Sequence, residues 1–147
     1  MKNWFECKVR YEKTQENGST RKVTEPYLFD ALSFTEAEAR IIEEISPFIS
    51  GEFTVSGIKK ANYSDLFFSD DASSDRWYKC KVEYITLDEK SGAERRTSTF
   101  MLVQASSVRD ALNRLDKGME GSMADYSIAS VAETPLMDVY VYKVQEE

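Results

Sequence analysis

Few residues of this 147-residue chain could do chemistry, and none of them forms a recognised catalytic set. The chain contains no histidine, the residue that most often carries protons near neutral pH. Ser56 and Lys59 have the Ser-x-x-Lys spacing of some acyl-transfer enzymes, but they fall in a predicted strand instead of at a helix start. Gly118 and Gly121 have the spacing of a KH-type loop, but Glu120 and the position after a helix favour a helix cap. The sequence therefore predicts no catalytic residue, no cofactor and no enzymatic activity.

The two cysteines, Cys7 and Cys80, offer little reactivity. Each lies on the apolar side of an alternating segment, which predicts a buried free thiol. Two cysteines without a histidine also make a poor metal site, so the sequence predicts no bound metal.

The tryptophans lie in the polar register of their strands, close to basic residues. Exposed indoles beside cations would suit a partner protein or a stacked base. Alternatively, each indole caps a small second core or an interface between the two halves of the chain, with its N–H bonded at the rim. Two adjacent basic pairs, 21–22 and 95–96, lie at the far side of the predicted hairpins and could extend such a patch. The candidate binding patch comprises Trp4, Lys8, Arg10, Trp77, Lys79, Lys81, Arg21, Arg95 and Arg96.

These residues recur because the chain reads as one unit written twice. Residues 4–11, WFECKVRY, return at 77–84 as WYKCKVEY, with five of the eight positions identical. Later matches continue at a spacing that shifts by one residue in a turn. The pattern predicts two repeat units, 1–73 and 74–147, and indels in turns are expected of a duplicated fold. A unit of about 73 residues would be marginal alone, so we expect both to form one globular domain.

Each repeat reads as strand, strand, helix, strand and possibly a final short strand. Gly18 and Gly92 mark hairpin turns, while Ser33 and Ser107 precede apolar residues at helical spacing and predict helix starts. The second strand of each repeat turns apolar on both faces toward its end, which predicts burial on both sides. The later strands are predicted at 22–31, 96–105, 52–60, 125–132 and 138–144, with a linker at 69–75. The predicted class is α+β, a mainly antiparallel sheet with helices packed on one face and a pseudo-two-fold arrangement.

Composition limits the partners. The net charge is −7, so the chain has no basic excess for phosphates. Nucleic acid is therefore disfavoured as a partner. The longest apolar runs of the chain are only a few residues, so we expect no segment that spans a membrane. The first residues form no apolar signal segment, so we expect a cytoplasmic location. The oligomeric state stays open.

Four blocks of sequence carry a resemblance to a known family. Residues 4–11, 23–28, 33–40 and 132–139 resemble a domain family of unknown function encoded by Bacteroidetes and their phages. The resemblance covers essentially the whole chain. It implies a bacterial cytoplasm and favours a mobile-element origin, but it supplies no activity and no functional residues.

Two functions from different classes are therefore carried forward. The first is a non-enzymatic binding module, a phage or mobile-element accessory that binds a protein partner. The alternative is an accessory factor of nucleic-acid metabolism that contacts single strands through Trp and Arg/Lys patches. An enzyme of unrecognised type is a third, weaker hypothesis. The spatial distribution of charge discriminates between the first two.

Overall fold

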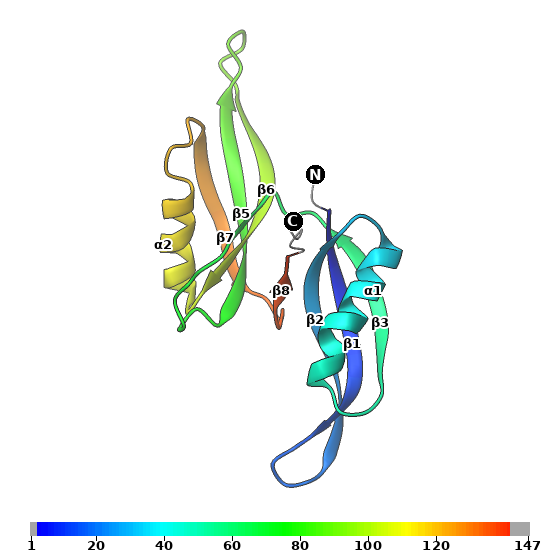
Figure 1. Cartoon of the computed structure of the whole chain (residues 1–147). Coiled ribbons are helices and arrows are strands. Elements are labelled where there is room, and N and C mark those ends of the chain that lie inside the picture. Colours follow the sequence, from blue (N-terminus) through cyan, green and yellow to red (C-terminus); the bar gives the residue numbers. More distant parts are fainter. Residues whose placement is uncertain (1–2, 142–147) are drawn as a thin grey trace, which may run out of the picture. The chain divides into compact units, whose positions relative to one another are not determined.

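The computed structural model describes residues 3–141 and divides the chain into two compact units (Figure 1). Unit 1 contains the chain up to Asn62 and again from Pro135, and unit 2 is Tyr63–Thr134. Each unit holds a four-stranded, largely antiparallel sheet and one α-helix, which confirms the predicted α+β class. Within the described part of the chain, no helix is long and apolar enough to cross a membrane.

Unit 1 is built on a long hairpin whose strands occupy the centre of the sheet. Its strand order is β3-β1-β2-β8, and only β8 runs parallel to its neighbour. The elements of unit 1 are β1 (Asn3–Thr14), β2 (Thr20–Ala31), α1 (Phe34–Ile45), the 3₁₀ turn η1 (Ser46–Phe48), β3 (Phe53–Ala61) and β8 (Val139–Tyr140).

Unit 2 has the same arrangement. Its strand order is β4-β6-β5-β7, in which β5 and β6 form the long hairpin and β4 is the parallel strand. The elements of unit 2 are β4 (Asp65–Phe67), β5 (Arg76–Leu87), β6 (Glu94–Ala105), α2 (Val108–Gly118) and β7 (Asp125–Glu133).

Each short parallel strand joins the sheet that does not contain the strand before it in the sequence. β4 follows β3 directly in the sequence but pairs with β6 in unit 2, where Leu66 lies opposite Leu102. β8 follows β7 but pairs with β2 in unit 1, where Tyr140 lies opposite Phe29. The compact units therefore divide the chain at 62/63 and 134/135, whereas the sequence repeats divide it after Ser73.

Alternation of side chains explains the two cores. On β1, Phe5, Cys7 and Val9 point toward α1, and Ala37 and Ile41 of the helix meet them in one buried cluster. The corresponding cluster of unit 2 contains Tyr78, Cys80, Val82, Ala111 and Leu115. Each helix thus buries one apolar stripe against one face of its sheet, as the sequence predicted.

The predicted helix starts and turns are also confirmed. The Oγ of Ser33 accepts a hydrogen bond from the Glu36 N–H at 3.2 Å, and Ser107 caps α2 in the same way. The Glu36 carboxylate in turn accepts from the Leu32 N–H at 3.2 Å, which satisfies a second free donor. Gly18 and Gly92 have φ values of 84° and 71° in the hairpin turns, a conformation that glycine adopts without strain.

Both thiols are buried and free, as predicted. Burial raises the pKa of Cys7 to about 12, with a smaller contribution from Glu6, and burial raises the pKa of Cys80 to about 11. Leu28 and Leu102 are fully buried on the face of each sheet away from the helix. The expectation of strands buried on both faces is therefore confirmed. Of the predicted last strand, residues 142–144 lie outside the described residues.

Candidate binding surface

The tryptophans do not form an exposed platform. Trp4 is 8% exposed and Trp77 is 3% exposed, and the ring of Phe68 meets Trp77 edge-on at 5.3 Å between centroids. Neither indole has a free face on which a base or a partner ring could stack. Burial thus fits the alternative in which each Trp completes a small apolar core and does not fit the exposed-indole patch.

The Lys79 ammonium group lies against aromatic rings of its own unit. Its Nζ is 4.5 Å from the ring centroid of Phe100 and 5.9 Å from that of Tyr63. Such contacts stabilise an exposed ammonium group by about 0.5–1 kcal/mol. Lys81, two residues along the strand, is only half-buried and belongs to the same face of the sheet.

The two arginines predicted on the β5–β6 hairpin are ion-paired. Arg96 lies 3.1 Å from a carboxylate oxygen of Glu83 and 3.7 Å from one of Glu94. Arg95 lies 3.9 Å from Asp88. The second hairpin, residues 81–99, carries four basic and four acidic residues and is electrically neutral.

The corresponding hairpin of unit 1 is charged differently. The first hairpin, residues 8–25, carries five basic and three acidic residues. Within residues 3–141, none of its cations forms an ion pair. All five are exposed to solvent. They are Lys8, Arg10, Lys13, Arg21 and Lys22.

Like charges also face one another across this hairpin. Lys13 of β1 lies directly opposite Arg21 of β2 in the antiparallel register. Directly opposite like charges destabilise a strand pair. Arg10 and Lys22 share the other face, because Lys22 lies opposite Glu12, two residues along β1 from Arg10. The folded hairpin thus concentrates positive charge on a chain whose net charge is −7.

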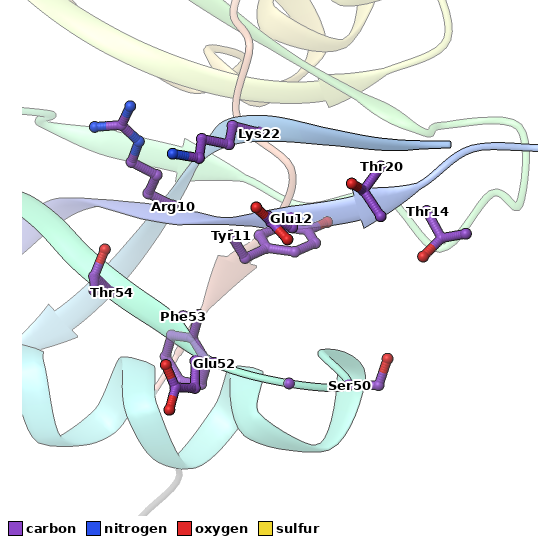
Figure 2. A pocket seen from close by; sticks show the side chains of 11 residues that line it. Arg10, Tyr11, Glu12, Thr14, Thr20, Lys22, Ser50, Glu52, Phe53 and Thr54 are labelled. Atoms are coloured by element: carbon purple, nitrogen blue, oxygen red, sulfur yellow. The ribbon is translucent and has the colours of Figure 1, made fainter. Parts of the chain in front are cut away.

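A groove of about 690 Å³ borders these cations (Figure 2). Arg10 and Lys22 extend from neighbouring strands to the same side of the hairpin in this view. The groove is lined by Arg10, Tyr11, Glu12, Thr14, Thr20, Lys22 and residues 50–54. A second hollow of about 590 Å³ at the hairpin tip is lined by Lys13, Arg21 and their neighbours.

Tyr11 is the aromatic residue of β1 in the groove. Its hydroxyl donates a hydrogen bond to Glu25 Oε1 at 2.5 Å. Partial burial, this hydrogen bond and the negative charge of Glu25 raise the pKa of Tyr11 to about 12. Tyr11 is therefore a neutral donor at physiological pH, and it engages one of the three carboxylates of the first hairpin.

Residues 3–142 match the family model described as a domain of unknown function, DUF4494. The chain belongs to this family. No curated protein matches the sequence. In the part of the chain that the structure describes, no three Cys, Asp or Glu side chains gather as a metal site.

The sequence places the candidate patch on both hairpins, whereas in the structure the arginines of the second hairpin are ion-paired and the five cations of the first hairpin form no ion pair within residues 3–141. The sequence does not single out Lys13, because this residue has no basic neighbour in the sequence and meets Arg21 only after the strands pair. A signal was nevertheless present in the repeats. In the predicted alignment of the two repeats, Arg10 stands at the position of Glu83, which is the carboxylate with which Arg96 pairs.

Proposed function

We propose that this protein is a non-enzymatic binding module that holds an acidic surface of a protein partner against its first hairpin. The observation that carries this proposal is the set of exposed cations on residues 8–25, which form no ion pair with any described residue, whereas the second hairpin has a net charge of zero. By the resemblance of its sequence, we place it among accessory proteins of phages or other mobile elements, acting in a bacterial cytoplasm.

Electrostatics supports this choice of surface. The Lys13–Arg21 repulsion is relieved when a partner carboxylate lies between the two cations. Complementary charge also steers the encounter and raises the association rate. Because the cations are exposed, binding should weaken as salt shortens the Debye length to about 8 Å near 0.15 M ionic strength.

The alternative is a factor that contacts single-stranded nucleic acid. In this alternative the bases stack on Trp4 and Trp77, but both indoles are buried. The cations of the first hairpin would still attract phosphates, so binding of nucleic acid by charge alone stays open as the alternative. A nuclease arm in the experiment separates the two functions.

The test is affinity capture from bacterial lysate with three immobilised proteins: wild type, a first-hairpin variant and a second-hairpin control. The first-hairpin variant combines Arg10→Gln, Lys13→Gln, Arg21→Gln and Lys22→Gln. The control combines Lys90→Gln, Arg95→Gln and Arg96→Gln. Thermal melting of all three shows whether each variant is folded.

We expect a protein that is retained by wild type and control, resists nuclease treatment and is lost with the first-hairpin variant. Equal capture by both variants would contradict the proposed surface. Retained material that disappears after nuclease treatment would favour the nucleic-acid alternative. Capture of no protein by any of the three would overturn the proposed function.

A further inference from the structure

The last three residues of β1 pair with a described strand on one edge only. β1 pairs with β2 as far as Thr14, but it pairs with β3 only as far as Tyr11, opposite Phe53. The chain before β3, residues 50–52, is not part of a strand. Among the described residues, no strand lies beside the outer edge of β1 from Glu12 to Thr14. Three residues of strand edge span about 10 Å.

The groove of about 690 Å³ lies at this outer edge. Glu12 and Thr14 line it from β1, and residues 50–52 line it from the other side (Figure 2). Its volume is within the range of about 300–1,000 Å³ that is usual for ligand sites. Extended segments commonly bind by adding a strand to such an edge, because main-chain hydrogen bonds supply affinity.

The two sides of the groove differ in chemistry. Arg10 and Lys22 lie on the face of the sheet away from α1, and Thr54 is opposite Arg10 on that face. Tyr11 and Phe53 are paired on the other face and supply half-buried rings. Successive side chains of a strand point to opposite faces. A segment in which acidic and apolar residues alternate therefore matches both sides at once.

We propose that the groove binds an extended segment of the partner protein as an added strand beside Glu12–Thr14. Acidic side chains of that segment lie on the face of the sheet that carries Arg10 and Lys22, and its apolar side chains lie on the face that carries Tyr11 and Phe53. This inference rests on the proposed function and specifies how the partner is held.

Glu12 and Glu52 also line the groove and oppose an acidic ligand. Removing the charge of Glu12 should therefore strengthen binding. Replacing Glu12 by Gln removes one like charge without removing backbone hydrogen-bonding groups, so affinity for an acidic segment should rise.

The test uses fluorescence anisotropy with a labelled seven-residue peptide that alternates valine and glutamate. Two comparison peptides carry lysine in place of glutamate, or N-methyl groups on the amides of alternate residues. Arg10→Gln/Lys22→Gln should weaken binding about tenfold, a loss reached by combining small contributions from two exposed charges. Arg96→Gln, the matched change in unit 2, should leave it unchanged, and Glu12→Gln should tighten it.

NMR locates the bound peptide. Amide shifts should change at residues 12–14 and 50–54 and stay constant in the second hairpin. Equal binding of the N-methylated peptide would overturn strand addition, and equal binding of the lysine peptide would overturn recognition by charge. No binding of the valine–glutamate peptide would overturn the inference, while captured protein that depends on the first hairpin would leave the proposed function standing.

Discussion

The C-terminal end of α2 leaves no room for a side chain at Gly118, because Phe67 of β4 fills the space. A Cβ atom at Gly118 would lie 2.6 Å from Cε1 of Phe67 and 2.9 Å from both Cδ1 and Cζ of that ring. The backbone of Gly118 does not require glycine, since its φ is not positive. The substitution Gly118→Ala therefore tests packing between β4 and α2, without backbone strain.

Two opposing effects set the magnitude. Alanine in place of glycine stabilises a helix by about 1 kcal/mol. Overpacking of a filled site costs about 1–3 kcal/mol. We expect Gly118→Ala to lower the free energy of unfolding of unit 2 by up to about 2 kcal/mol. When Phe67 is also replaced by Ala, the steric cost disappears and the same substitution should stabilise by about 0.5–1 kcal/mol.

The assay is a double-mutant cycle in urea, followed by the fluorescence of Trp77 in a Trp4→Phe background. The coupling between Gly118→Ala and Phe67→Ala should equal the steric cost, about 1–3 kcal/mol. Asn113→Ala, an exposed change in the same helix, is the control and should have the same effect with or without Phe67. Stabilisation by Gly118→Ala in the wild-type background, or a cost that persists without Phe67, would show that the Phe67 ring does not limit the space at Gly118.

Three further predictions concern stability and activity. Cleavage after Ser73 separates β4 from β6 and β8 from β2, so neither fragment should melt cooperatively by calorimetry; a sharp transition in either fragment would contradict this. Ionisation of Cys7 should leave the free energy of unfolding unchanged below pH 9 and lower it between pH 9 and about pH 12. The reason is that the folded state keeps the thiol proton of Cys7, whose pKa is raised from 9.0 to about 12. By pH 12 this effect of Cys7 amounts to about 4 kcal/mol of the free energy of unfolding. The urea midpoint of Cys7→Val, measured against pH, should therefore fall less steeply above pH 9 than that of the wild type. Equal slopes for the two proteins would contradict the role of the thiol. Hydrolase, nuclease and phosphatase assays with divalent metals should stay at background because the chain has no histidine, and a turnover abolished by one Asp or Glu substitution would overturn this.

Local signals made much of the fold predictable. The long hairpins follow from alternating side chains and from Gly18 and Gly92, and the helix starts follow from Ser33 and Ser107. These features depend on residues close together in the sequence. The bounds of β2, β3, β6 and β7 differ from the expected positions by no more than two residues, which is usual for element boundaries. The last strand is expected at 138–144, whereas β8 is Val139–Tyr140 and residue 141 is not part of a strand.

Other features depend on distant contacts and could not be predicted in this way. β4 has only three residues, too few to show a periodicity, and its choice of β6 as a partner is not encoded locally. The alternation of side chains correctly places Trp4 and Trp77 on the same face as the polar residues of their strands, but it does not show that both indoles are buried on that face. The basic pairs 21–22 and 95–96 look equivalent in sequence, yet Arg96 pairs with Glu83 whereas Lys22 pairs with no carboxylate of the described chain.

The late position of β8 in the chain affects the order in which the protein can fold on the ribosome. Unit 2 is encoded without interruption, so its sheet can close once residue 134 has emerged. Unit 1 must wait for β8, which follows the end of β3 by roughly 80 residues. At a synthesis rate of about 5–20 residues per second, this wait lasts on the order of 4–16 s. During that interval, the backbone groups of β2 at Leu28 and Phe29 are open to any other strand, including one from a neighbouring nascent chain.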